Sequence, residues 1–155
     1  MPPVNTRNRP YDMRTILLAS VATLLALQAS ADSIKVCYDK AKTQSDTNVC
    51  AGFELDVADK DLNSVYQEIL RNYKDDKKFL DNIKAAQQAW LKWRDAEIKA
   101  IYPEGYDPVV YGSSIRSCWN QQVAALTRDR TQQLRKWVEG GEEGDVCSGS
   151  MPIKE

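Results

Sequence analysis

The stretch TNVCAGFELDVADKDLNSVYQEILRNY, residues 47–73, decides the fold. Its apolar side chains recur at gaps of three and four residues, which places them on one face of a helix. These positions are Val49, Phe53, Leu55, Ala58, Leu62, Val65, Tyr66, Ile69, Leu70 and Tyr73. The pattern predicts one long amphipathic helix, with Ser45 or Asp46 as its N-cap after a polar turn.

Two more long helices follow along the chain. Asp75-Asp76 interrupts the first pattern and caps a second helix, which ends at Tyr102-Pro103 because the residue before a proline avoids the helical conformation. Ser113 or Ser114 caps the last helix, and Gly140-Gly141 stops it. A short helix over residues 33–42 precedes all three, and strand-like alternation is absent. We therefore expect an all-α antiparallel bundle of three long helices plus a short N-terminal helix, held by disulfides.

The first 31 residues have the three parts of a secretory signal peptide. Arginines give a basic start, residues 16–27 are apolar (ILLASVATLLAL), and Ala29-Ser30-Ala31 offers a cleavage site. The apolar run is shorter than the roughly 20 residues of a membrane-spanning helix. We expect cleavage after Ala31, with Met13 as an alternative start, no later membrane insertion, and a periplasmic or secreted protein. The predicted organisation is a signal at 1–31, a helical domain at 32–139 and a flexible tail at 140–155.

The charge of the expected mature chain excludes one class of partner. Removing three arginines and Asp12 with the signal leaves 18 basic and 21 acidic side chains, a net charge of −3. No basic stripe is present, so nucleic acid is not an expected partner. We expect the partner to be another protein.

The even number of cysteines in an exported chain predicts two disulfides. Cys37 and Cys50 flank the first turn, thirteen positions apart, and a bridge there would join the short helix to the long one. Cys118 and Cys147 are then left for each other, which requires the tail to run back along the last helix and could tether it. Zinc is the alternative, but the chain has no histidine and no CxxC pair. We expect no metal and no cofactor.

Several polar side chains lie on or beside the apolar stripes of all three long helices. They are Asp59, Asn63, Gln87, Arg94, Asp95 and Arg130. One interpretation is a ligand site inside the bundle. The other is a satisfied polar network that fixes how the helices align, and we favour it because a buried guanidinium needs a carboxylate such as Asp59 or Asp95.

The loop YPEGYDPVVYG, residues 102–112, is the predicted partner-binding site. The loop presents aromatic and acidic side chains, and aromatic side chains are common at binding hot spots. Its two prolines limit the conformational entropy that the loop loses on binding. The residues are Tyr102, Glu104, Tyr106, Asp107 and Tyr111. The alternative is that the tyrosines only cover the end of the bundle. Trp93 lies off the apolar stripe of its helix, so we expect it either to pack against the short N-terminal helix or to be exposed for contact.

Enzymatic function is not expected. Without histidine the commonest general base is missing, and oxidised cysteines offer no thiolate nucleophile. The chain has no G-x-S-x-G, S-x-x-K or phosphate-binding glycine loop. Carboxylates such as Asp95 or Glu97 remain, but on an acid-rich helical chain these are usually solvated. No catalytic residue is assigned.

Four strings carry a resemblance to a known family. They are Cys37 to Cys50, then ADKDLNSVY at 58–66, AQQAWLKWRDAE at 86–97, and a last pattern of Cys118, Thr127, Arg130 and Leu134. In this order they resemble the LprI-like family of small exported bacterial domains, named for a mycobacterial lysozyme-inhibitor lipoprotein. The resemblance spans roughly residues 37–137. It implies a helical, disulfide-bonded envelope protein with lysozyme inhibition as the family's named activity.

Two departures from the family pattern accompany the resemblance. The family usually has a cysteine where this chain has Ile98, and that cysteine would ordinarily pair with Cys118. Its absence, with the additional Cys147, implies that the second bridge has moved. The family also tends to have Gly-Gly-Ser before the last helix, where this chain reads PVVYGSS.

Two functions follow as expectations. The first is a protein-binding module that inhibits lysozyme or another peptidoglycan hydrolase. The alternative is a structural or accessory envelope protein without inhibitory activity. A protruding aromatic loop would favour the first, and a broad exposed apolar helix face would favour the second.

Overall fold

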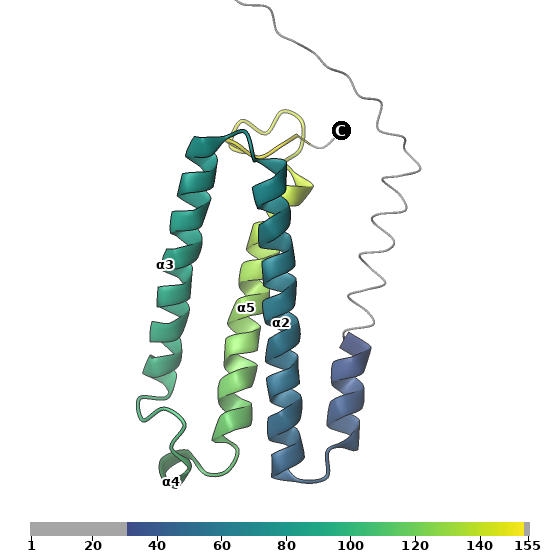
Figure 1. Cartoon of the computed structure of the whole chain (residues 1–155), viewed down its shortest axis with the longest axis vertical. Helices are drawn as coiled ribbons and strands as arrows, with labels where there is room; N and C mark the ends of the chain where they lie inside the picture. The colour runs from purple at the N-terminus through teal and green to yellow at the C-terminus, as the bar shows by residue number, and fades with distance from the viewer. Residues whose placement is uncertain (1–30, 154–155) are drawn as a thin grey trace, which may run out of the picture.

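The computed structural model describes residues 31–153. Residues 31–40 are helical and are followed by α2 (Gln44–Asn72), α3 (Lys77–Ile101), α4 (Pro108–Tyr111) and α5 (Ile115–Glu139). The predicted all-α bundle of three long helices and a short N-terminal helix is confirmed (Figure 1). The predicted signal peptide, except for its last residue, lies outside the described residues. Among the described helices, none is both long and apolar enough to cross a bilayer.

The start of α2 differs from the sequence prediction. Thr43, not Ser45 or Asp46, is the N-cap. The Thr43 hydroxyl accepts a hydrogen bond from the Asp46 amide at 3.1 Å, and the Asp46 carboxylate accepts one from the Thr43 amide at 2.9 Å. This reciprocal capping box satisfies amides that the first helical turn leaves unpaired, so the helix begins three residues before residue 47. Hydrogen bonds from the Lys42 amide and from Thr43 lower the pKa of Asp46.

The turn between α2 and α3 lies where the sequence indicated. Asp76 is the N-cap of α3, and its side chain accepts a hydrogen bond from the Phe79 amide at 2.9 Å. Tyr73, at the end of α2, stacks on Phe79 with ring centroids 4.0 Å apart, and both rings contact Trp137 of α5. The hairpin end is therefore a packed aromatic corner joining all three long helices.

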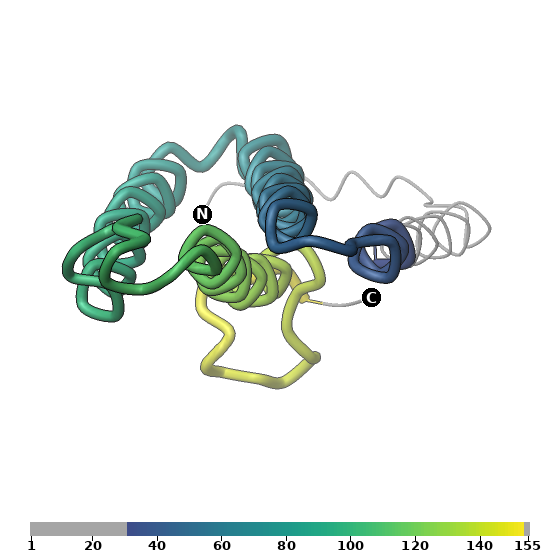
Figure 2. The backbone as a smooth tube through the Cα atoms, turned by 90° about the horizontal axis from the view of Figure 1, so that it is seen from below, coloured from purple at the N-terminus to yellow at the C-terminus, as the bar shows by residue number. Residues whose placement is uncertain are grey.

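α5 packs closely along α2 and contacts α3 less extensively. The side chains between α2 and α5 are small: Ala51, Ala58 and Ala124 are almost fully buried, as is Thr127. Small side chains let two helix axes approach closely. Figure 2 shows α3 set off to one side of the α2–α5 pair.

The core lies mainly in the half of the bundle nearest the hairpin. It is built from apolar side chains of α2, α3 and α5, each at most 7% exposed. These are Leu62, Val65, Ile69, Phe79, Ile83 and Leu134. The apolar stripe predicted for α2 is wrong at its first turns, where Val49 is 68% exposed and Phe53 is 37% exposed. Cys50 and Ala51 are buried instead, and the side chain of Cys50 is bonded to Cys37 of the N-terminal helical segment.

The N-terminal helical segment, residues 31–40, is fixed to α2 by the predicted Cys37–Cys50 disulfide, with Cα atoms 5.6 Å apart. Polar contacts also connect this segment, α2 and α5. The Tyr38 hydroxyl donates to the Glu54 carboxylate at 2.9 Å, and Arg128 of α5 pairs with Glu54 at 2.8 Å. Burial raises the pKa of the Tyr38 phenol.

The predicted Cys118–Cys147 bridge is wrong, since both cysteines are free thiols. Cys118 lies near the start of α5, and Cys147 lies beyond its end, about 30 Å away along the helix. The tail does not run back along α5. It turns on itself at the far end, where Gly141 pairs with Ile153 and the Gly141 amide donates to the Pro152 carbonyl at 2.7 Å. Gly140, with φ of 80°, permits this turn because a side chain there would collide with Pro152.

Replacing Cys37 and Cys50 by serine is expected to lower the free energy of unfolding by about 3 kcal/mol, because a 13-residue loop is no longer closed in the unfolded chain. Denaturant unfolding of the oxidised protein measures this loss. The control variant, with serine at Cys118 and Cys147, is expected to change much less. Thiol titration of the denatured, unreduced protein should find two free thiols, and finding none would contradict the assignment.

Candidate functional site

One end of the bundle brings together the α3–α5 loop and the first turns of α2 and α5 (Figure 1). Asn48 of α2 joins these parts. Its amide nitrogen donates to the Ser113 carbonyl at 3.2 Å, and its amide oxygen accepts from the Ser117 backbone amide at 3.1 Å. Gln44 donates to the Ser117 hydroxyl at 3.2 Å. These bonds hold the starts of α2 and α5 together, so the loop between α3 and α5 stands on a fixed base.

Trp119 of α5 supports the loop. The Tyr106 ring stacks on the indole at 4.5 Å between centroids with an interplanar angle of 30°, and Tyr102 stacks on it at 5.8 Å and 27°. Tyr111 meets Tyr102 edge to face at 5.5 Å. Each such pair contributes about 0.5–1.5 kcal/mol beyond the area it buries. Together they fix the loop against α5.

Tyr106 is both held in place and accessible. Its hydroxyl donates to the Asn120 side-chain oxygen at 3.2 Å, yet the residue is 46% exposed. The Arg116 guanidinium carbon lies 5.9 Å from the centre of the Tyr106 ring. Burial raises the pKa of the Tyr106 phenol, while the positive charge of Arg116 acts in the opposite direction.

The tip of the loop is a single helical turn, which the sequence prediction treated as irregular. Pro108 occupies its first turn, and the Asp107 carboxylate caps it by accepting from the Val109 amide at 2.8 Å. The turn projects two apolar side chains outward, since Val109 is 91% exposed and Val110 is 55% exposed. The tip of the loop is therefore an ordered turn that presents apolar side chains, which the predicted set of aromatic and acidic residues did not include.

A hollow of about 630 Å³ opens at this end of the bundle. Residues of α2, α5 and the loop line it: Ser45, Asn48, Val49, Tyr106, Arg116 and Asn120. Its walls thus combine side-chain amides, one guanidinium and an aromatic ring. We call this hollow, with the exposed valines of α4, the end surface.

The structure divides the predicted partner-binding residues into two groups. Tyr106 is exposed on the end surface, and Glu104 is exposed on the loop but does not line the hollow. Tyr102 and Tyr111 are partly buried in the aromatic stack, and Asp107 serves as a helix cap. The interpretation that tyrosines cover the bundle end therefore holds for two of the three.

Sequence reasoning missed other residues of the end surface. Val109 and Val110 were read only as loop residues, and Arg116 and Asn48 were not singled out. A signal for Arg116 was present, because a basic residue two places after a helix cap is unusual, given that the field of the helix favours acids there.

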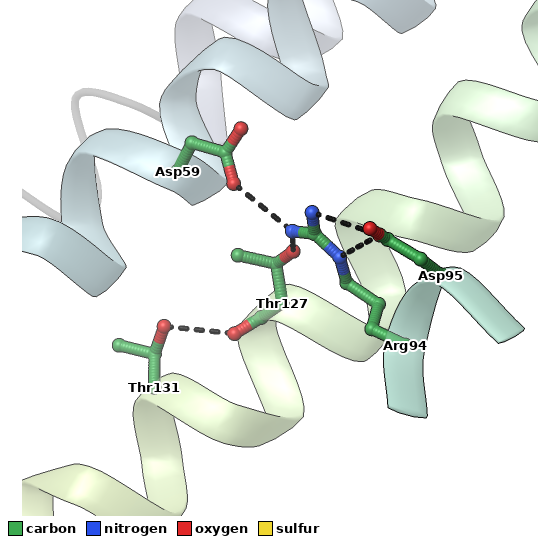
Figure 3. Close-up of polar contacts among 5 residues, drawn as sticks. All are labelled: Asp59, Arg94, Asp95, Thr127 and Thr131. Carbon is green, nitrogen blue, oxygen red and sulfur yellow. Dashed lines mark hydrogen bonds and ion pairs between the residues drawn. The ribbon is translucent and has the colours of Figure 1, made fainter. Parts of the chain in front are cut away.

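A second feature is a polar cluster midway along the bundle, drawn in Figure 3. Arg94 of α3 has a side chain only 16% exposed. It lies 3.6 Å from the Asp59 carboxylate of α2 and 3.4 Å from Asp95, and it donates to the Thr127 hydroxyl of α5 at 3.3 Å. Thr131 donates in turn to the Thr127 carbonyl at 2.9 Å. One guanidinium thus connects all three long helices.

Arg130 of α5 forms the neighbouring part of this cluster. Its guanidinium donates one hydrogen bond to the side-chain oxygen of Gln87 in α3 at 3.0 Å and one to the side-chain oxygen of Gln133 at 3.1 Å. Both guanidinium groups form cation–π contacts with the Trp90 ring. The guanidinium carbon of Arg94 lies 5.3 Å from the ring centroid, and that of Arg130 lies 5.9 Å from it. Burial lowers the pKa of Arg130. The arginines of the predicted network therefore have distinct partners, acidic for Arg94 and neutral for Arg130.

Asn63 does not join the network. It is exposed, and the hydrogen bonds identified within residues 31–153 do not include it. The reason is its position, roughly a third of a turn away from the buried stripe of α2. Asn63 instead lines a hollow of about 390 Å³ between α2 and α3, next to a second of the same size, and both have Asp59 and Arg94 in their walls.

The polar cluster is arranged for support. Its donors and acceptors are paired, and the described residues contain no buried side-chain nitrogen or oxygen without a hydrogen-bond partner. Within the same residues, no group of three acidic or cysteine side chains is placed to hold a metal ion. At the end surface, by contrast, apolar, aromatic and cationic groups are accessible together.

Comparisons with known proteins give a family. A sequence model of the family described as lysozyme inhibitor LprI matches residues 37–134. An uncharacterized protein of Rhizobium meliloti (strain 1021) is 29% identical over 114 residues, covering 66% of this chain and 79% of the relative. No solved structure matches the chain significantly. The family match spans α2, α3 and most of α5, and so includes both the end surface and the polar cluster.

The polar cluster makes stability depend on pH. Burial raises the pKa of Asp59 above its usual 3.8, with Arg94 acting in the opposite direction. A carboxyl with a raised folded-state pKa contributes stability that is complete at low pH and is lost as the pH rises through that pKa. Relative to Asp59→Asn, the wild type should therefore lose stability as the pH rises from below the usual pKa of 3.8 through the raised pKa of Asp59.

Thermal unfolding of both proteins across that range measures the effect. Repeating the comparison in an Arg94→Met background supplies the matched control. Without the guanidinium the pKa of Asp59 should rise further, so the loss should extend to higher pH. A difference between wild type and Asp59→Asn that stays constant with pH would contradict the account.

Proposed function

Because the chain belongs to the LprI family of lysozyme inhibitors, we propose that it binds and inhibits a lysozyme or a related peptidoglycan hydrolase. The observation that carries the proposal is the family match over residues 37–134, the part of the chain that builds the three-helix frame. The family is one of inhibitors and not of enzymes. The function is then to occupy a partner protein's surface rather than to catalyse a reaction.

The end surface is the proposed contact region. Two exposed valines, a half-exposed tyrosine and an arginine lie on a base fixed by Trp119 and Asn48. Aromatic and arginine side chains are the commonest binding hot spots. A loop that is already ordered loses little conformational entropy when it enters a cleft. These properties support insertion of the α4 tip into the groove of a hydrolase.

We also propose that the protein acts in the periplasm or after secretion. The signal-like pattern in residues 1–31 supports export. The Cys37–Cys50 disulfide supports an oxidising compartment. Peptidoglycan hydrolases work in the same compartment, so inhibitor and target would meet there.

A second candidate, an accessory envelope protein, rests on the outer face of α3. Trp93 is 50% exposed there, within a run of exposed alanines that includes Ala89 and Ala96. Exposed apolar faces mark contact surfaces in many proteins. This face could bind a constitutive envelope partner, and it would then be the contact surface in place of the end surface.

One substitution separates these surfaces. Val109→Asp is expected to reduce inhibition at least about 10-fold, because a charge would have to be buried in the contact. Val109 makes few contacts within the protein, being 91% exposed, so stability should be unchanged. A cell-wall lysis assay over a small panel of lysozymes measures inhibition, and thermal unfolding measures stability.

Val146→Asp is the matched control, since Val146 is 96% exposed and lies in the tail at the other end of the bundle. It should inhibit like the wild type. If Val109→Asp also inhibits like the wild type while Trp93→Asp does not, the contact lies on α3. If the wild-type protein inhibits no lysozyme of the panel, the proposed function is wrong and the accessory role gains support.

A further inference from the structure

Arg116 has no acidic partner within residues 31–153, and it lies in the first turn of α5, where a cation brings no benefit to its helix. Arg94 pairs with Asp59 and Asp95, and Arg128 pairs with Glu54. None of the ion pairs formed within residues 31–153 involves Arg116. Its one identified interaction is with the Tyr106 ring at 5.9 Å.

The position of Arg116 works against α5. It lies in the first turn of that helix, after the N-cap Ser114. The N-terminal end of a helix carries a partial positive charge, which disfavours a cation and favours an acid. The Ser114 side chain makes no capping hydrogen bond that would compensate. A residue that lowers the stability of its own helix and has no ion pair is more simply explained by binding than by folding.

The surroundings of Arg116 define the group that it would bind. The hollow beside it is lined by the Asn48 and Asn120 side chains and by Tyr106, and no acidic side chain lines it. Arg116 is exposed, so its guanidinium donors can face a partner. A guanidinium is shaped to donate two parallel hydrogen bonds to a carboxylate. The hollow therefore fits an anionic, planar group presented by another protein.

Hydrolases that cleave glycosidic bonds contain such groups. They generally use a pair of carboxyl groups on either side of the bond to be cleaved, at the bottom of the substrate cleft. Resting on the proposed function, we infer that Arg116 pairs with an active-site carboxylate of the inhibited hydrolase, while the valines of α4 contact the apolar wall of the cleft. The Tyr106 ring restricts the motion of the Arg116 side chain, which lowers the entropy that pairing costs.

The test is a double-mutant cycle on the full chain and on the lysozyme that the wild-type chain inhibits most strongly. Binding of Arg116→Ala and Arg116→Lys is measured by calorimetry, with the enzyme's catalytic carboxyl groups intact and with each replaced by its amide. Arg116→Ala is expected to weaken binding to the intact enzyme at least about 30-fold, and Arg116→Lys less. Against one of the amide variants, the effect of Arg116→Ala should fall below about 3-fold.

Two controls separate binding from folding. Arg71→Ala removes an exposed arginine from the opposite end of the bundle and should bind like the wild type. Arg116→Glu places an acid where the helix favours one, so it should raise the melting temperature while it abolishes inhibition. A merely structural role for Arg116 predicts the opposite change in melting temperature.

Each outcome decides the question. If Arg116→Ala binds as tightly as the wild type, the inference is wrong while the proposed function stands. If Arg116→Ala weakens binding equally to intact and amide enzymes, Arg116 contacts some other group and the carboxylate assignment is wrong. If the wild-type chain binds no lysozyme, the proposed function fails and the inference fails with it.

Discussion

The indole of Trp119 determines what this protein can present to a partner. Tyr102 and Tyr106 of the loop stack on this indole. The α4 turn follows them in the chain and precedes α5, so the stacked rings position it. Without this support a loop with two prolines and two glycines would sample many conformations. With it, the valines of α4 and the guanidinium of Arg116 are held on one rigid surface. The end surface therefore depends on a residue that is itself largely covered.

The α2–α5 pair and α3 are packed in different ways. α2 and α5 approach closely, with small side chains such as Ala58 and Ala124 buried on them, whereas α3 contacts α5 less extensively. Arg94 connects the three helices through Asp59 and Thr127. Such a cluster adds little net stability, because the cost of desolvating the charges offsets most of the attraction between them. The cluster instead fixes how the helices align, and this alignment determines where the loop after α3 begins.

The sequence predicted the helices because their signals are local. Helical spacing, Asp76 as a cap and the stop at Gly140 are all read from neighbouring residues, and the Cys37–Cys50 pair closes a short loop. Two of the failures depend on tertiary contacts. The burial of Cys50 in place of Val49 goes with the N-terminal helical segment, which is bonded to Cys50 through Cys37, and the unpaired Cys118 depends on where the tail lies in space.

The candidate site was predicted only in part for the same reason. Composition drew attention to the tyrosines of the loop, but burial on Trp119 decides which of them can meet a partner. Tyr106 is accessible, while Tyr102 is largely committed to the stack. Arg116 lines the hollow of the end surface because the first turns of α2 lie against the start of α5, a relation that the linear pattern does not contain.

We propose that a cell-wall hydrolase binds at the end of the bundle that is built on Trp119. Hydrogen–deuterium exchange of the chain, free and mixed with a lysozyme that it inhibits, tests this most directly, because it reports on every segment without altering the protein. The account predicts slower exchange in the complex over residues 102–120 and at the start of α2, with residues 85–100 unchanged. Protection confined to residues 85–100, on the face that carries Trp93, would contradict it.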